Sequence, residues 1–149
     1  MVLVLSRGLT GDTCIYTRPV DNLRGLEATR DCYCLTARKA ARSLTRLYEE
    51  HLRPHGLRAT QFSVLAALAV KGPTRVVELA EMLGLERTTL TRSVALLQRD
   101  GWIGMVRSED QRERVLRITD EGLRKLESAL PAWQQAQEIA GRTFPAATV

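Results

Sequence analysis

The stretch VVELAEMLGLERTTLTRSVALLQRDGWI, residues 76–103, contains two short apolar patterns with the period of a helix. Gly84 stands between them and suits the left-handed turn that ends a helix. The second pattern predicts a helix over residues 86–99. The residues expected to face the core are Val77, Leu79, Ala80 and Leu83 in the first helix and Leu90, Val94 and Leu97 in the second. Two short helices joined by a tight turn predict a helix-turn-helix.

Two strand patterns follow this pair of helices. WIGMVRS, residues 102–108, and RVLRIT, residues 114–119, are separated by the polar segment EDQRE, residues 109–113, so they predict a β-hairpin. A short extended piece is expected earlier in the chain, at residues 75–76. A hairpin directly after a helix-turn-helix predicts a winged helix-turn-helix.

Longer helical patterns lie on both sides of this region. Apolar residues recur at helical spacing over residues 23–52, and Pro54 ends the pattern. A further helix is expected over residues 60–70, and a last one begins at residue 119, where Pro131 should kink or break it. The residues expected to be buried are Phe62, Leu65, Ala66 and Leu68 in the helix over residues 60–70, and Leu123, Leu126, Leu130 and Trp133 in the last helix.

The composition is that of a globular protein. The chain has 149 residues, of which 44% are hydrophobic and 26% are charged. We expect one mainly α domain with a small β wing over residues 23–149, preceded by a poorly ordered tail of residues 1–22. No apolar run approaches the roughly 20 residues of a membrane span, and three cysteines are an odd number for a secreted disulfide framework. These features predict a cytoplasmic protein with free thiols and no membrane partner.

The second helix of the pair turns a polar face outward when its apolar residues face the core. Arginine offers two donors that match guanine, and threonine bonds phosphate or base edges and touches the thymine methyl group. The net charge of +5 also favours an anionic partner, nucleic acid before a membrane surface. The outward residues are Arg87, Thr88, Thr91, Arg92 and Ala95. A solvated polar face is the alternative, but the position in a helix-turn-helix followed by a basic hairpin favours DNA.

The hairpin carries arginines around an acidic tip. Arg107, Arg112 and Arg114 flank a turn that contains Asp110. A basic tip suits the minor groove, whose negative potential attracts arginine. A free Asp110 would repel phosphate, so we expect it to pair with Arg112 or Arg114 and stiffen the wing. An ordinary charged turn is the alternative.

Two stretches resemble the MarR family of bacterial transcription regulators. They are the helix-turn-helix segment, residues 76–103, and RSEDQRERVLRITDEG, residues 107–122. The Asp-x-Arg-x-Arg wing and the ITDEG that follows it are the most specific parts. The resemblance covers roughly residues 27–144. Two residues depart from the family pattern, because Glu86 and Arg58 stand where the family usually has short capping residues.

The resemblance implies a symmetric dimer, held by the helices over residues 23–53 and 120–146, that binds a palindromic operator. Residues 59–119 then form the DNA-binding lobe. It also implies that Arg112 enters the minor groove. The positions that fall on the recognition helix are Arg87, Thr88, Thr89, Thr91 and Arg92. Dimerisation is also expected from geometry, because one helix-turn-helix buries too little surface for tight specific binding.

One sensor hypothesis involves Cys34, and the alternative role for this residue is that of a small apolar side chain in a helix seam. Arg30 and Arg38 stand four residues before and after it and are expected to lower the pKa of its thiol. Residues 34–62 resemble the organic-hydroperoxide-sensing branch of the family, in which Cys34 falls on the reactive cysteine and Tyr48 on a tyrosine. Two further tyrosines of that branch are Arg38 and Ala59 here. Cys32 lies off the seam of Cys34, so a disulfide between the two within one helix is not expected.

The favoured function is a repressor that a small-molecule effector releases from its operator, with the effector bound between the dimer helices and the DNA-binding lobe. Repression rests on the family resemblance alone. An oxidant sensor acting through Cys34 is the alternative, and a winged-helix protein-interaction module is a further one. The sequence does not specify the effector, the operator or the regulated genes.

Enzyme motifs are absent from the sequence. It has no glycine-rich phosphate loop, no G-x-S-x-G and no H-E-x-x-H. His51 and His55 are four residues apart, but Pro54 interrupts the helix between them and no carboxylate set accompanies them. The sequence therefore predicts no catalytic site, no metal site and no cofactor.

Overall fold

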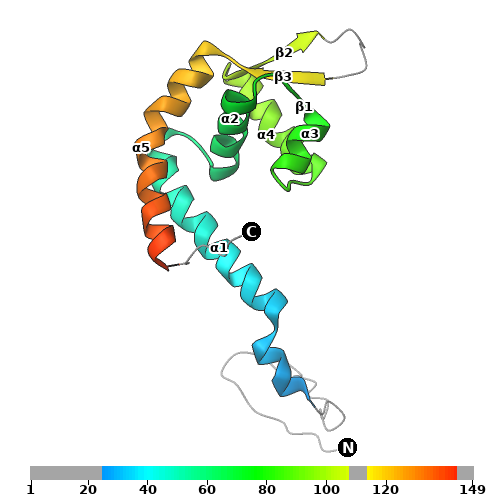
Figure 1. Cartoon of the computed structure of the whole chain (residues 1–149), viewed down its shortest axis with the longest axis vertical. Helices are drawn as coiled ribbons and strands as arrows, with labels where there is room; N and C mark the ends of the chain where they lie inside the picture. The colour runs from blue at the N-terminus through cyan, green and yellow to red at the C-terminus, as the bar shows by residue number, and fades with distance from the viewer. Residues whose placement is uncertain (1–24, 108–113, 144–149) are drawn as a thin grey trace, which may run out of the picture. The chain divides into compact units, whose positions relative to one another are not determined.

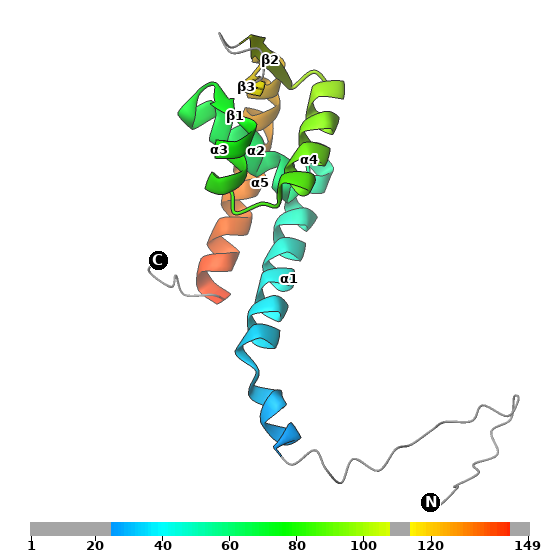
Figure 2. The same ribbon diagram turned by 90° about the vertical axis from the view of Figure 1, so that its right-hand side faces the viewer.

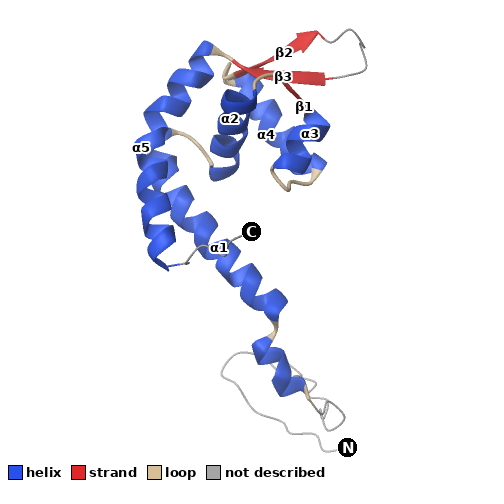
Figure 3. Ribbon diagram, viewed as in Figure 1, coloured by secondary structure: helices blue, strands red, loops and turns tan. Residues whose placement is uncertain are grey.

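The computed structural model describes residues 25–107 and 114–143 of the chain. It is mostly helical with one small antiparallel sheet, which confirms the expected fold class (Figure 3). No helix in these two ranges is long and apolar enough to cross a membrane. The elements in chain order are η1 (Leu26–Asp31), α1 (Tyr33–Leu52), η2 (Arg53–His55), α2 (Ala59–Lys71), β1 (Thr74–Arg75), α3 (Val76–Met82), α4 (Arg87–Arg99), β2 (Ile103–Arg107), β3 (Arg114–Ile118) and α5 (Asp120–Thr143).

The chain divides into two compact units, residues 1–37 and 38–149. In the described part of the first unit, a 3-10 helix precedes α1. Cys32 separates them, since its backbone is extended (ψ 112°) and its carbonyl accepts the bond from Thr36 N–H that opens α1. One continuous helix from residue 23 was therefore a wrong prediction, because apolar spacing does not distinguish a 3-10 turn from an α-helix.

In the second unit, α2 is the central helix. It packs against α5 on one side and against α4 and β3 on the other (Figure 1). In the turned view, α3 and α4 lie on either side of α2 (Figure 2). Phe62, Leu65 and Leu68 are buried as expected, while Ala66 is only half-buried. Val64 is buried as well, because α2 has neighbours on more than one side.

The sheet has the strand order β1-β3-β2, and both pairs are antiparallel. Ile103 pairs with Ile118 and Arg107 with Arg114, so β2 and β3 form the predicted hairpin. β1 begins one residue earlier than expected, at Thr74, whose buried hydroxyl donates to the Gly72 carbonyl over 2.8 Å.

The helix-turn-helix forms as predicted, with one error. Leu90, Val94 and Leu97 of α4 are buried, and Gly84 has a φ of 58° in the turn. Val77, however, is 54% exposed. Because α3 begins at Val76, its inward face follows the spacing i, i+3, i+4, i+7, which excludes the second residue of the helix. That face consists of Val76, Leu79, Ala80 and Leu83.

The last helix differs most from expectation. α5 continues through Pro131, so the predicted break is wrong. Its buried residues are small, and Leu123 and Leu130 are exposed instead. Small side chains allow the helix to lie close to its neighbours, which the leucine pattern did not predict. The buried set is Gly122, Ala129, Ala132, Ala136 and Ala140.

Candidate nucleic-acid interface

The outward face of α4 is polar, exposed and held from behind by its buried leucines and valine. Among the residues that the structure describes, no ion-pair partner reaches Arg87 or Arg92. Glu86 precedes the helix and its side chain makes no cap hydrogen bond, as its identity predicts. The guanidinium groups of Arg87 and Arg92 therefore meet no carboxylate in the part of the chain that the structure describes. The sequence-predicted residues exposed there are Arg87, Thr88, Thr89, Thr91 and Arg92.

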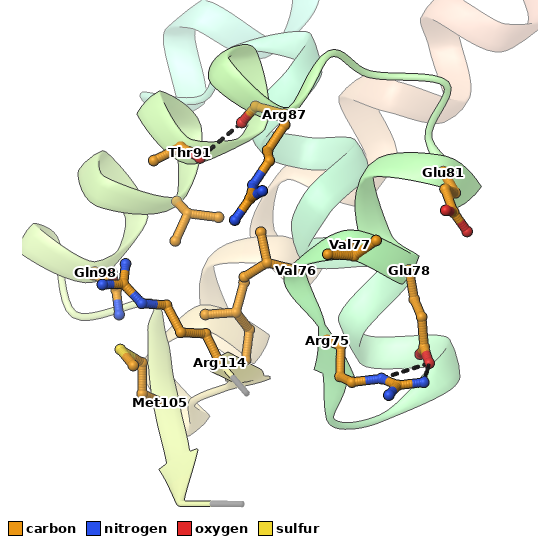
Figure 4. A pocket seen from close by; sticks show the side chains of 12 residues that line it. Arg75, Val76, Val77, Glu78, Glu81, Arg87, Thr91, Gln98, Met105 and Arg114 are labelled. Carbon is orange, nitrogen blue, oxygen red and sulfur yellow. Dashed lines mark hydrogen bonds and ion pairs between the residues drawn. The ribbon is translucent and has the colours of Figure 1, made fainter. Parts of the chain in front are cut away.

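A cavity of about 550 Å³ lies between α3, α4 and the sheet. Val76, Val94 and Leu116 supply apolar lining, while Arg87 of α4 and Arg114 of β3 reach into it from different elements (Figure 4). This cavity lies within residues 59–119, the lobe expected to bind DNA. The effector pocket expected between that lobe and the dimer helices is a different site and stays a prediction.

Only part of the predicted wing is described. Arg114 begins β3 and is exposed, opposite Arg107 in the hairpin register. Asp110 and Arg112 lie outside the described residues, so their pairing and the minor-groove role of Arg112 stay predictions.

The N-terminus of α2 is capped by a carboxylate from α1, a contact that was not predicted from the sequence. Glu49 Oε1 accepts the Ala59 N–H over 2.9 Å, and its Oε2 lies 3.0 Å from Arg58 Nη1 and 3.4 Å from Arg53 Nε. Gln61 Oε1 accepts the Arg58 N–H over 2.9 Å. Glu49 thus provides the cap that Arg58 cannot. The sequence indicated only that Arg58 is a poor capping residue. It did not indicate Glu49 as the cap, because Glu49 lies ten residues before Ala59 and belongs to no periodic pattern.

This environment shifts the titration of Glu49. Partial burial by itself raises the pKa of the carboxyl, but the hydrogen bonds from Ala59 and Arg58 and the charge of Arg58 outweigh it. The net effect holds the pKa of Glu49 below its ordinary value, so the carboxylate stays charged where it caps α2.

Two contacts hold α5 against other helices. Phe62 of α2 stacks on Trp133 with ring centroids 5.6 Å apart, and the hydroxyl of Tyr48 in α1 donates to Gln137 Oε1. Burial raises the pKa of Tyr48. Trp133, expected to be buried, is half-buried and packs on Phe62 of its own chain.

The surroundings of the candidate sensor cysteines agree only in part with expectation. Cys32 and Cys34 are free and exposed. Arg30 lies in η1, before the extended residue Cys32, so its expected i−4 position on the helix of Cys34 is wrong. Arg38 does follow Cys34 by one turn of α1. Within the described ranges no group of three or more histidines, cysteines or carboxylates is placed to hold a metal ion.

Comparison with known proteins identifies the family of this chain. The model of the MarR family matches residues 57–113. The transcriptional regulator MosR of M. tuberculosis, crystallised in complex with DNA, is 38% identical, with a TM-score of 0.69 over 76% of this chain and 84% of that one. The chain belongs to the MarR family.

A curated relative agrees with this assignment. The uncharacterised HTH-type transcriptional regulator YwoH of Bacillus subtilis (strain 168) is 35% identical over 89 residues, which is 60% of this MarR-family chain. The match spans 65% of the length of that relative. The protein AbfR, solved bound to DNA in reduced and overoxidized states, is 25% identical, and its overoxidized form has a TM-score of 0.65 over 73% of this chain and 81% of that one. The MarR family, MosR and YwoH are transcriptional regulators and not enzymes, as expected from the sequence.

Proposed function

We propose that this MarR-family chain is a homodimeric, sequence-specific DNA-binding transcription regulator. The observation that carries the proposal is the outward face of α4, where Arg87, Thr88, Thr91 and Arg92 are exposed on a helix anchored by Leu90, Val94 and Leu97. The first turns of the second helix of a helix-turn-helix are the part that enters the major groove. The MosR structure with DNA supports the same partner for this chain.

The proposed dimer reads a palindromic operator, one half-site for each subunit. Half-exposed apolar side chains on α5, Leu123 (37%), Leu130 (40%) and Ile139 (42%), offer surface to a second copy. The proposed contact helices are those over residues 23–53 and 120–146. By family analogy the protein acts as a repressor, which a small-molecule effector releases from DNA.

The test of DNA binding is an arginine replacement. We expect the Arg87→Ala, Arg92→Ala double variant to lose about 1–3 kcal/mol for each arginine that contacts a base. Fluorescence anisotropy with a duplex from upstream of its own gene measures this, and binding should weaken steeply with salt. The charge-matched control is Arg99→Ala, Arg117→Ala, since both residues are exposed and lie outside the first turns of α4 and outside the proposed dimer helices.

Equal affinity of the double variant and the wild type for the duplex would exclude α4 as the DNA-reading element. It would favour instead the protein-interaction module.

A second candidate function is oxidant sensing through Cys34. The exposed thiol of this residue, one helical turn before Arg38, supports it, as does a relative studied in reduced and overoxidized states on DNA. Cumene hydroperoxide should then release DNA from the wild type and from Cys32→Ser, but not from Cys34→Ser. Equal release from all three proteins would remove this candidate, and release by a phenolic acid under reducing conditions would support a ligand-responsive repressor.

A further inference from the structure

Three threonines lie in the first turns of α4, and one of them differs from the other two in its hydrogen bonding. The hydroxyl of Thr91 donates to the Arg87 carbonyl over 2.7 Å. Within the described ranges, the hydroxyls of Thr88 and Thr89 form no hydrogen bond. All three residues are exposed. Thr88 and Thr89 therefore offer hydroxyl donors to a partner, whereas the hydroxyl donor of Thr91 is already used.

The difference follows from position in the helix. A threonine hydroxyl can bond the carbonyl four residues earlier when that carbonyl belongs to the same helix. Since α4 begins at Arg87, Thr91 is the first of the three with such a carbonyl. The residues four before Thr88 and Thr89 are Gly84 and Leu85, which precede the helix.

The bond of Thr91 fixes which of its groups faces outward. With its hydroxyl turned back to Arg87, the γ-methyl group of Thr91 is directed away from that bond (Figure 4). The hydroxyl proton is used within the helix, so Thr91 has no donor to offer a base or a phosphate without breaking this bond. The surface it presents toward a partner is the methyl group.

Ala95 extends this apolar surface by one helical turn. It is exposed and stands four residues after Thr91, a spacing that places side chains next to each other on a helix. Arg92 and Thr88 flank the pair with polar groups. In the major groove the thymine C5-methyl is the apolar group of a base edge, and threonine methyl and alanine side chains are among its usual contacts.

Resting on the proposed DNA binding, we propose that Thr91 recognises a thymine through its γ-methyl group. Each operator half-site then contains an A·T pair at the position that Thr91 faces, and the hydroxyl of Thr91 takes no part in recognition. Thr88 and Thr89 keep free hydroxyls and contact polar groups.

The experiment begins with duplexes that the wild-type protein enriches from random-sequence DNA. Each thymine of the half-site is then replaced in turn by deoxyuridine, in both half-sites together, which removes only the methyl group. Loss of one buried methyl contact corresponds to about fourfold in the dissociation constant for each half-site. We expect the wild type to lose this affinity at one thymine position.

Two variants separate the methyl group from the hydroxyl. Thr91→Val keeps the methyl and should retain both the affinity and the sensitivity to deoxyuridine at that position. Thr91→Ser keeps the hydroxyl and should bind the thymine duplex about fourfold more weakly for each half-site, with no further loss on deoxyuridine. Ser63→Ala is the control, because Ser63 of α2 is exposed, lies outside α4 and the proposed dimer helices, and donates to the Ala59 carbonyl in the same way, over 3.1 Å.

Two results would overturn the inference while DNA binding stands. One is a loss of affinity in Thr91→Val as large as in Thr91→Ser, and the other is a thymine profile shared by the wild type and Thr91→Ser. Failure of the wild type to enrich any duplex would instead refute the proposed function and this inference with it. Circular dichroism melting of each variant identifies losses due to unfolding.

Discussion

Glu49 occupies, from the preceding helix, the role that a Ser, Thr or Asp side chain usually has at a helix N-terminus. Its carboxylate accepts the Ala59 N–H and lies beside two arginines, so the charged form is the one that stabilises the fold. The folded-state pKa of Glu49 is below its ordinary value of 4.5. Its contribution is therefore complete above that value and is lost as the pH falls through the lower folded-state pKa.

We expect Glu49→Gln to be less stable than the wild type by about 1 kcal/mol at about pH 7, because it keeps a hydrogen-bond acceptor but loses the charge. The difference should shrink as the pH falls through the lowered folded-state pKa of Glu49, where the wild type becomes protonated. Urea unfolding over a series of acidic pH values measures it. Glu50→Gln is the control, since Glu50 is the exposed neighbour. A difference that does not change with pH would contradict this assignment.

Two glycines of α5 form a matched pair. A Cβ on Gly122 would lie 2.1 Å from the Trp102 carbonyl oxygen, whereas a Cβ on Gly141 would meet nothing within 4 Å. We expect Gly122→Ala to destabilise the protein by about 1–3 kcal/mol through overpacking. Gly141→Ala should stabilise it by up to about 1 kcal/mol, because alanine is the better helix former. Thermal melting compares them, and equal shifts would show that the approach of α5 to Trp102 is not close.

At the scale of elements, apolar periodicity correctly predicted the buried residues of α4, which depend on one face of the helix. It failed where burial depends on contacts with several neighbouring elements. Leu90, Val94 and Leu97 fix the rotation of α4 and hence the exposure of Arg87 and Thr91. In α5 the leucine spacing gave the wrong face, because the helix packs through small residues. Its buried alanines also recur at helical spacing, but the larger leucines were expected to be buried instead. The cap from Glu49 is likewise a contact between helices.

The orientation of α4 predicts a difference between adjacent leucines. Leu97 is fully buried and Leu96 is 42% exposed. We expect Leu97→Ala to lose about 2–5 kcal/mol of unfolding free energy, while Leu96→Ala changes it by about 0.5 kcal/mol or less. Denaturant titration measures both. Similar losses from the two variants would mean that α4 is rotated differently.

At the scale of the whole molecule, the sequence predicted the class of partner better than the details of contact. The polar front of α4 and the hairpin follow from local patterns, so both were predicted from residues 76–118. Arg112 lies outside the described ranges, so its predicted role is untested, and the proposed effector pocket would involve the proposed second chain. The proposed recognition of thymine by Thr91 was not predicted from the sequence, because it depends on a hydroxyl bond that is set by the residue at which α4 begins.

The last prediction concerns the proposed dimer. One helix-turn-helix buries too little surface for tight specific binding, and two bind half-sites about 34–36 Å apart. Leu130→Glu places a charge on a half-exposed apolar position of α5. We expect it to shift the protein toward the monomer in sedimentation velocity and to weaken binding to a palindromic duplex far more than to a single half-site.

Val70→Glu is the control for this substitution, since Val70 is 90% exposed at the end of α2, outside the proposed dimer helices. It should sediment and bind as the wild type does. If Leu130→Glu also remained dimeric with unchanged affinity, the contact between subunits would have to involve surfaces other than this part of α5. Because unfolding would reduce affinity for both duplexes, a loss confined to the palindrome separates dimer disruption from a folding defect.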